Sequence, residues 1–243
     1  MKNACLSKTC VMGILAWENE LIQYPGNLIH PDTFSFPVQI DRVNGANYDT
    51  VVKSPSDHIA REFAISAQHL EANGVDLIIS TTGLSILFQN IITDSVSIPV
   101  ITSSLMFVPM LSSIIGRKKK IGIITAGEQL LSKDHLKVAG IDEKQVQIVG
   151  VDKYPVFESL AIKPEAVRSS KEVETISVEL AKELMSKESN IGLIVIEVTG
   201  LCAGSGAIRK QIGLPVMDIV ECAVFFHNAI TADRWNERRS QSV

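Results

Sequence analysis

Two short polar stretches, each following an apolar strand-like run, are the positions in this sequence best suited to chemistry. Thr81-Thr82-Gly83 follows Leu77-Ile78-Ile79, and Val198-Thr199-Gly200 follows Leu193-Ile194-Val195-Ile196. In open parallel sheets, ligands bind beyond the carboxyl ends of the strands, where helix N-termini present free N–H groups and favour negative charge. We therefore expect a small anion to bind between the two stretches, against the candidate binding residues Thr81, Gly83, Val198 and Gly200.

Side chains in and near these stretches carry hydroxyl, acid or thiol groups. Glu197 is an acid at the end of an apolar strand, where burial would raise its pKa and make it a base. The alternative is that Glu197 pairs with a lysine or with backbone N–H groups and only supports the loop. Cys202 is either a thiol near the site or a buried structural cysteine. Together with the hydroxyls, these give four candidate catalytic residues: Thr82, Glu197, Thr199 and Cys202.

Two further segments carry groups that bind carboxylates. Ser103 and Ser104 end a strand and open a helix, so they either cap that helix or donate hydrogen bonds to ligand oxygens. Asn27 lies in the long loop from Trp17 to Pro37, which either closes over the ligand, with the amide holding a carboxylate, or is a surface excursion.

The elements that must position these residues alternate along the chain. Apolar, β-branched runs predict strands at Thr9–Leu15, Val38–Arg42, Leu77–Ser80, Pro99–Ile101, Ile121–Thr125, Val146–Gly150, Leu193–Glu197 and Val216–Met217. Helical patterns lie between them at Asp57–Ala72, Leu105–Ile115, Glu128–Ala139, Pro164–Lys187 and Ile219–Trp235. Continuously apolar strands suit parallel sheets covered by helices on both faces. The fold class is therefore α/β.

An internal repeat indicates two similar lobes. Leu77-Ile78-Ile79-Ser80 aligns without gaps on Leu193-Ile194-Val195-Ile196, and at the same spacing Ile98-Pro99-Val100 aligns on Leu214-Pro215-Val216. A duplicated fold explains this correspondence, while chance likeness between two buried strands is the alternative. We expect two pseudo-symmetric lobes with a ligand cleft between them, one formed by residues 1–101 and 216–243, the other by residues 102–215.

Composition narrows the function classes. The net charge of −4 argues against a nucleic-acid partner, and no apolar stretch approaches the ~18–20 residues that a membrane span needs. The four cysteines lack C-x-x-C spacing and Met1–Cys10 lacks an apolar signal core, so we expect reduced thiols and a cytoplasmic protein. The histidines and cysteines show no metal-site spacing, so we expect no metal. The glycines of residues 200–206 match neither a dinucleotide fingerprint nor a phosphate-binding loop.

The chain resembles the aspartate/glutamate racemase superfamily, which includes hydantoin racemases, maleate isomerases and arylmalonate decarboxylases. The resemblance spans nearly the whole length and rests on the order and spacing of five stretches: Met12–Leu15, Tyr24–Val38, Thr81–Gln89, Thr102–Leu105 and Glu197–Thr199. It implies a cofactor-independent enzyme, a homodimer, in which two cysteines flank the α-carbon of a small carboxylic acid. One thiolate removes the proton and the other thiol returns one from the opposite face.

The sequence departs from this pattern at both cysteine positions. The first falls on Thr82 and the second on Val198. A threonine hydroxyl needs a neighbouring base, and a valine side chain carries no proton. A shifted alignment would bring in Cys202, in a Cys-Ala-Gly similar to that of hydantoin racemases. We therefore expect either an enzyme acting at the α-carbon of a small carboxylate or amino-acid-like substrate with a non-standard acid/base set, or a catalytically silent protein that binds such a ligand.

Overall fold

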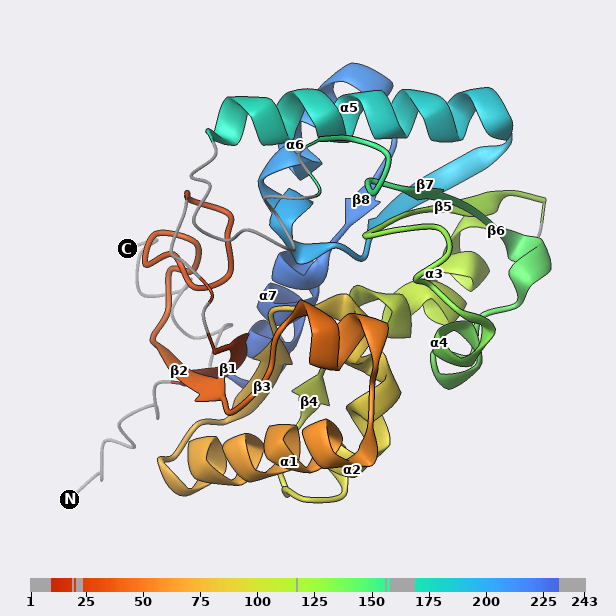
Figure 1. Cartoon of the computed structure of the whole chain (residues 1–243). Helices are drawn as coiled ribbons and strands as arrows, with labels where there is room; N and C mark the ends of the chain where they lie inside the picture. Colours follow the sequence, from red (N-terminus) through yellow and green to blue (C-terminus); the bar gives the residue numbers. More distant parts are fainter. Residues whose placement is uncertain are drawn as a thin grey trace, which may run out of the picture.

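Two four-stranded parallel sheets form the framework of the molecule (Figure 1). The structure is a computed structural model that describes residues 10–18, 20, 24–116, 118–155, 157 and 169–231. The first sheet has the order β2-β1-β3-β4 and the second the order β6-β5-β7-β8. Their strands are β1 Met12–Trp17, β2 Val38–Val43, β3 Leu77–Ser80, β4 Val100–Ile101, β5 Lys120–Thr125, β6 Val146–Gly150, β7 Ile191–Ile196 and β8 Val216–Met217. The predicted α/β fold with two similar lobes is confirmed.

Helices flank both sheets. They are α1 Asp57–Ala72, α2 Gln89–Thr93, α3 Val108–Ile115, α4 Lys133–Val138, α5 Ser170–Lys187, α6 Ser205–Ile212 and α7 Ile219–Ile230, with short helical turns η1 Tyr48–Lys53, η2 Gly83–Phe88, η3 Ser104–Phe107, η4 Glu143–Gln145 and η6 Thr199–Gly204. None of the helices in the described part of the chain is long and apolar enough to cross a bilayer.

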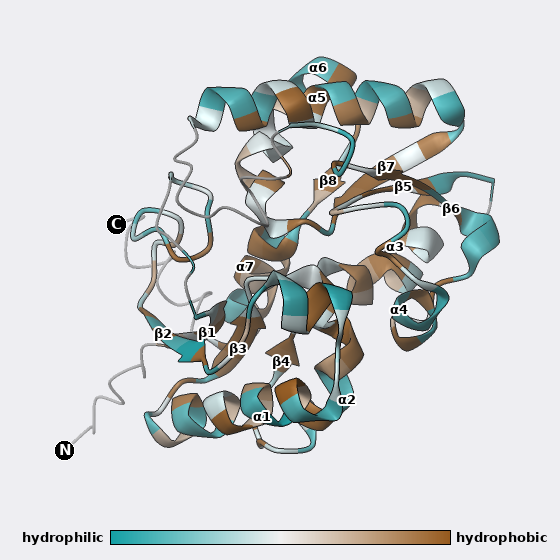
Figure 2. Ribbon diagram, viewed as in Figure 1, coloured by the Kyte–Doolittle hydropathy of each residue, from teal (hydrophilic) through white to brown (hydrophobic). Residues whose placement is uncertain are grey.

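The long helices α1 and α5 each bury one face against a sheet. In α1 the buried residues include Phe63, Ala67 and Leu70, at the three-to-four-residue spacing of an amphipathic helix. Figure 2 shows hydrophobic strands and a mixture of hydrophilic and hydrophobic residues along both helices. Every residue of β3 and β7 is buried, as expected for central parallel strands covered on both faces. Burying one such large apolar side chain contributes roughly 1.5–3 kcal/mol.

Two helices cross between the lobes. Although α3 follows β4 along the chain, it packs against β5 and β7 of the second sheet. Conversely, α7 follows β8 and returns to contact β3 of the first sheet, and it lies between the two sheets in Figure 1. One hydrophobic core therefore runs through both lobes, from Met12 and Leu77 to Ile194 and Ile219. Strand β8 pairs with β7, so the second sheet extends to Met217, two residues past the boundary expected from sequence.

The internal repeat is present in the structure as a repeated supersecondary unit. The elements η6, α6 and β8 begin 116 residues after η2, α2 and β4, respectively. The strand registers repeat as well, because Ile78 pairs with Val100 in the first sheet and Ile194 with Val216 in the second. The spacing read from two apolar runs thus extends to a helical turn, a helix and the next strand.

Local capping sets helix starts that periodicity alone misplaces. We expected a helix from Glu128, but α4 begins at Lys133 because Ser132 and His135 form a capping box and residues 128–131 form turns. The helix expected from Pro164 begins at Ser170, after the Ser169 cap, and residues 158–168 lie outside the described residues. The C-terminal part of the helix expected to end at Trp235 also lies outside them.

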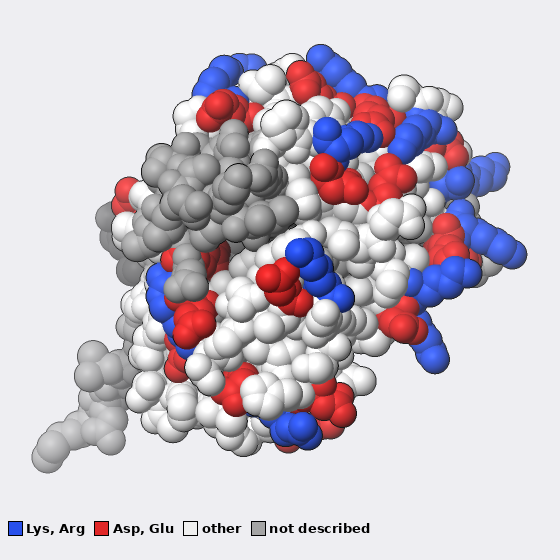
Figure 3. Space-filling view, viewed as in Figure 1, with Lys and Arg blue, Asp and Glu red and all other residues white. Residues whose placement is uncertain are grey.

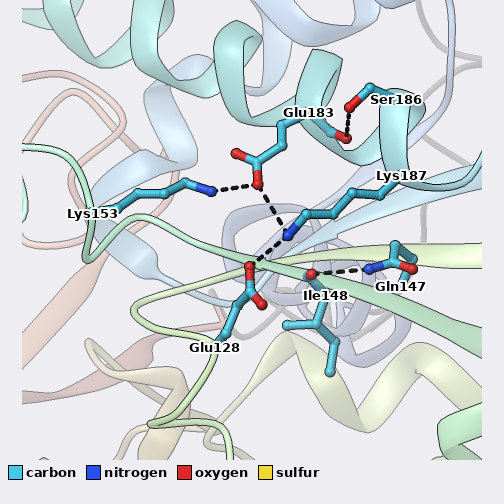
Figure 4. A network of polar contacts seen from close by, with 7 residues as sticks. All are labelled: Glu128, Gln147, Ile148, Lys153, Glu183, Ser186 and Lys187. Atoms are coloured by element: carbon cyan, nitrogen blue, oxygen red, sulfur yellow. Dashed lines mark hydrogen bonds and ion pairs between the residues drawn. The ribbon is translucent and has the colours of Figure 1, made fainter.

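Charged side chains of both signs are interspersed over the face in Figure 3, densely over the second lobe. One network there ties α5 to the loops after β5 and β6 (Figure 4). Glu183 of α5 binds Lys153 and lies 3.1 Å from Nζ of Lys187, which in turn reaches Glu128 at 2.9 Å. The network braces the outer helix of the second lobe.

Candidate active site

The two stretches singled out in the sequence meet where the lobes contact each other. Thr82 follows β3 and occupies the N-cap position of η2, while Val198 follows β7 and occupies the N-cap position of η6. Neither side chain caps its helix by a hydrogen bond. The first N–H groups of each helical segment have no partner within their own helix. The structure therefore places Thr82 and Val198 at equivalent positions of the two repeats, with backbone donors following each.

Hydrogen bonds join the strand ends across the boundary between the lobes. The hydroxyl of Thr199 donates to the carbonyl oxygen of Thr81. The buried hydroxyl of Ser104 donates to the carbonyl oxygen of Ile196 at 2.8 Å. We call this boundary, formed by residues 81–83 and 197–200, the seam. The seam is held by direct protein contacts, so the side chains around it are fixed by both lobes.

A glycine allows the closest approach at the seam. A Cβ atom on Gly83 would lie 2.4 Å from Oε1 of Glu197 and 2.6 Å from the Glu197 carbonyl oxygen. Both distances are far below van der Waals contact. Gly83 therefore permits the Glu197 side chain to lie against the start of η2.

Glu197 is deeply buried at the seam without a cationic partner in the part of the chain that is described. Its side chain is 2% exposed, and its Oε2 accepts hydrogen bonds from the Thr125 hydroxyl at 2.7 Å and the Ala126 N–H at 3.2 Å. Burial raises the pKa of Glu197 to about 7, and these two hydrogen bonds oppose the rise only in part. The backbone-paired role that the sequence offered as an alternative is thus present. The raised pKa also leaves the carboxyl able to hold a proton at neutral pH.

Thr82 presents a free hydroxyl at the seam. The residue is half-buried, and its hydroxyl makes no hydrogen bond to any described residue. Its backbone is held instead, because the Thr82 carbonyl oxygen accepts from both the N–H and the hydroxyl of Ser85. Thr82 is therefore fixed in place while its side chain remains available to a ligand.

Cys202 is placed deeper than a catalytic thiol requires. It is 6% exposed in η6, and Asp218 together with the N–H groups of Ile219 and Val220 surrounds its sulfur. Burial, reinforced by the negative charge of Asp218, raises the pKa of the Cys202 thiol well above its usual range. A thiol that resists ionisation is a poor base at neutral pH. This geometry favours the structural interpretation of Cys202.

The serines that open the third helical turn are used inside the protein. Ser103 accepts a hydrogen bond from the Leu105 N–H and caps η3, which is one of the two roles considered for it. Ser104 ties the connection after β4 to the carbonyl oxygen of Ile196 in β7. Both residues are buried, at 0% and 1% exposure. Their hydroxyls therefore stabilise the backbone next to the seam.

The long loop after β1 folds back over η6. The Tyr24 hydroxyl donates to the Gly200 carbonyl oxygen at 2.7 Å. A Cβ atom on Gly26 would lie 2.8 Å from Cβ of Ala203, so this glycine packs directly on η6. Asn27 is buried, and its Oδ1 accepts from the Ile29 N–H at 3.2 Å. The loop thus bridges the first lobe to the second at the seam.

A further acid, Glu20, was missed by the sequence analysis. It follows β1, the neighbour of β3, so it reaches the same sheet edge as Thr81. The residue is half-buried, yet burial of its carboxylate raises its pKa to about 7, opposed by the nearby Thr81 hydroxyl, the Trp17 N–H, Arg42 and the Asn27 amide. The buried Thr81 hydroxyl makes no hydrogen bond to a described residue. It therefore lowers the pKa of Glu20 as a nearby dipole. Applying the strand-end rule to the first strand as well would have identified Glu20.

The described residues offer no second candidate site. Within the described ranges, no three His, Cys, Asp or Glu side chains gather in a way that could hold a metal ion. A surface hollow on the first lobe is lined by residues of η1, the start of α1 and the turn after β2, among them Asp49, His58 and Asn44, and contains none of the candidate residues.

Comparison with known proteins places the chain in a family. No family model matches it. It is 30% identical over 226 residues to a dimethylsulfoniopropionate lyase from Durusdinium sp. clade D, covering 90% of this chain and 74% of that protein. It is 29% identical over 230 residues to dimethylsulfoniopropionate lyase 7 from Emiliania huxleyi strain CCMP1516, covering 88% of this chain and 65% of that protein. The chain belongs to the dimethylsulfoniopropionate lyase family.

Comparison with solved structures identifies the fold of this chain. Allantoin racemase from Klebsiella pneumoniae superposes with a TM-score of 0.62 at 16% identity, over 94% of this chain and 92% of that chain. Arylmalonate decarboxylase gives 0.61 at 12% identity, over 93% of both chains. The fold is that of the aspartate/glutamate racemase superfamily, as the resemblance implied. Within that fold, Thr82 and Val198 occupy the two equivalent strand ends.

Proposed function

We propose that the protein is a cofactor-independent lyase that removes the proton next to the carboxylate of a small β-substituted propionate, with dimethylsulfoniopropionate as the leading candidate. The observation that carries this proposal is the asymmetry of the seam, where Thr82 and Val198 occupy equivalent N-cap positions of the two repeats. Racemisation needs a group that carries a proton on each face of the α-carbon, and a valine side chain carries no proton. An elimination needs a base on one face only. The names of the lyase relatives support the same choice.

The proposed step balances without an added reagent. A base removes one α-proton, the C–H electron pair forms the Cα–Cβ double bond, and the Cβ–S bond breaks so that dimethyl sulfide leaves with the Cβ–S bonding pair. The products are acrylate, dimethyl sulfide and one proton, which the base passes to water. Negative charge grows on the substrate carboxylate as the α-proton leaves, so donors aimed at that carboxylate stabilise the transition state.

The seam supplies such donors. The free hydroxyl of Thr82 and the first N–H groups of the helical segments after Thr82 and Val198 lie at the two strand ends. The amide of Asn27, in the loop that covers η6, is a further candidate donor. A small carboxylate is the ligand that this set fits.

A second function, binding without turnover, is favoured by one observation. The raised pKa of Cys202 leaves no ionised thiol at the site, and Val198 carries no proton, so both positions considered for the second cysteine lack a working acid or base. A protein with only the donor set would hold the carboxylate and release it unchanged.

Proton NMR in D₂O distinguishes these functions. The purified protein is incubated with dimethylsulfoniopropionate, other 3-substituted propionates, allantoin and an arylmalonate. We expect acrylate vinyl signals from the first, and a roughly 10²–10³-fold lower rate for Thr82→Val, which removes one transition-state donor. Thr175→Val, on the exposed face of α5, is the control and should retain the wild-type rate. Interconversion of allantoin enantiomers without acrylate formation would refute the lyase, and line broadening without products would favour the binding protein.

A further inference from the structure

We propose that Glu20 is the general base of this lyase, a catalytic role that rests on the proposed function. The carboxylate lies beside the Thr81 hydroxyl and the Asn27 amide, at the start of the loop whose Tyr24 reaches η6. Thr81 in turn accepts the hydrogen bond from Thr199 through its carbonyl oxygen. Glu20 is therefore one residue removed from the contact between the lobes.

The chain holds Glu20 in position through its backbone neighbours. The Trp17 N–H donates to Oε2 of Glu20 at 3.4 Å, and the Glu20 N–H donates to the Trp17 carbonyl oxygen at 3.3 Å. Arg42 of β2 fixes the same turn, because its Nη1 donates to the carbonyl oxygens of Trp17 at 3.0 Å and Glu18 at 3.2 Å. A base must be oriented before it can act, and this turn provides that orientation.

The other acid and thiol near the seam are less suited to this role. The Glu197 carboxylate is 2% exposed, with Oε2 engaged by Thr125 and Ala126 and Oε1 against Gly83. The sulfur of Cys202 faces Asp218 and the start of α7. Glu20 alone of these three is half-buried rather than buried. Of the three residues, only Glu20 therefore reaches the protein surface.

The surroundings of Glu20 also suit a base that works near neutral pH. Burial raises its pKa to about 7, while the Thr81 hydroxyl, the Trp17 N–H, the Arg42 charge and the Asn27 amide lower it in that order. A base acts when deprotonated, so kcat/KM should rise with pH through about 7 and level off above it. Removing the Arg42 charge should move this rise to higher pH.

Enzyme kinetics test the role directly. Glu20→Gln keeps the size of the side chain and should lower kcat by roughly 10²–10⁴-fold, as expected for loss of a general base. Glu18→Gln is the matched control, because Glu18 lies two residues away and is exposed. Arg42→Gln should shift the acidic limb of the kcat/KM profile upward, whereas Arg42→Lys, which keeps the charge, should shift it less. A Glu20→Gln enzyme within tenfold of wild type would overturn the inference.

A second measurement does not depend on turnover. In protein carrying ¹³C-labelled glutamate carboxyls, the Glu20 resonance, assigned by its loss in Glu20→Gln, is titrated with and without propionate. Because a carboxylate bound at the seam adds a negative charge beside Glu20, its pKa should rise. An unchanged Glu20 pKa at saturating propionate would overturn the inference. An inactive wild-type protein that still shows the pKa rise would refute the lyase reaction while keeping Glu20 at the ligand site.

Discussion

At the scale of single residues, Glu197 shows how a carboxyl group can sit between two lobes without a counter-charge. Burial raises its pKa from an ordinary 4.5 to about 7, so the protonated carboxylic acid is its stable form up to neutrality. Protonated, it keeps one oxygen for Thr125 and Ala126 and avoids the cost of a buried charge beside Gly83. The acid that the sequence marked as unusual is therefore part of the contact between the lobes.

The raised pKa of Glu197 predicts a pH dependence of stability. Below pH 4.5 the carboxyl is protonated in both the folded and unfolded states, and its contribution is fully present. As the pH rises through about 7, the unfolded state ionises first, so the free energy of unfolding falls, by roughly 3 kcal/mol in total at about 1.4 kcal/mol per pKa unit. Glu197→Gln should remove this pH dependence. The difference in the free energy of unfolding between wild type and variant, measured by urea unfolding, should therefore change sharply between pH 4.5 and 8.

Glu183 provides the control for that measurement. Its pKa is lowered by the ammonium groups of Lys153 and Lys187, against a burial effect of opposite sign. Its contribution is therefore present above the unfolded pKa and is lost as the pH falls below it, the reverse of Glu197. Glu183→Gln should cost at most about 1 kcal/mol at neutral pH, as for other surface ion pairs. If the free energy of unfolding depends on pH equally in Glu197→Gln and in wild type, Glu197 is not the group with the raised pKa.

At the scale of elements, the packing of α5 on η6 depends on one glycine. A Cβ atom on Gly204 would lie 2.1 Å from Oγ and 2.4 Å from Cβ of Ser177. Both distances are shorter than van der Waals contact. Gly206, two residues later on α6, meets nothing within 4 Å. Gly204→Ala should therefore destabilise the protein by roughly 1–3 kcal/mol, whereas Gly206→Ala should stabilise it by about 0.5–1 kcal/mol. Thermal unfolding of the pair checks both signs, and a stable Gly204→Ala protein would show that α5 can shift.

The elements also show what sequence patterns can predict. The bounds of α1 and β6 agree with the expectation to the residue, because both have strong periodicity and clear ends. The repeat is visible because buried strands and their entry prolines are constrained in type. The exchange of α3 and α7 between lobes was not predicted, since an amphipathic face does not say which sheet it covers. Glu20 follows a strand end that the sequence also predicted, so the same rule applied to β1 would have found it, whereas its neighbours Thr81 and Asn27 come only from the fold.

At the scale of the whole molecule, the two lobes form one cooperative unit. A single core passes through both sheets, and the contact at the seam lies at its centre. A protein whose lobes share a core should unfold in one transition even though its sheets are separate. This matters for the proposed chemistry, because donors from Thr82 and from η6 act together only if the lobes stay in register.

The Ser104 hydroxyl tests that coupling. It is 1% exposed and ties the connection after β4 of the first sheet to the Ile196 carbonyl oxygen of β7 in the second, so Ser104→Ala should lower the free energy of unfolding by roughly 1–3 kcal/mol. Ser113→Ala is the control, because the exposed Ser113 hydroxyl bonds only within α3, to Pro109. Urea unfolding is followed by far-UV circular dichroism and, in a Trp235→Phe background, by fluorescence of Trp17 in the first lobe. We expect the two signals to coincide in every variant, with a lower midpoint and unchanged slope for Ser104→Ala. A circular dichroism transition that continues after the Trp17 signal is complete would mean that the lobes unfold separately, and the seam would then be a contact between two independent units.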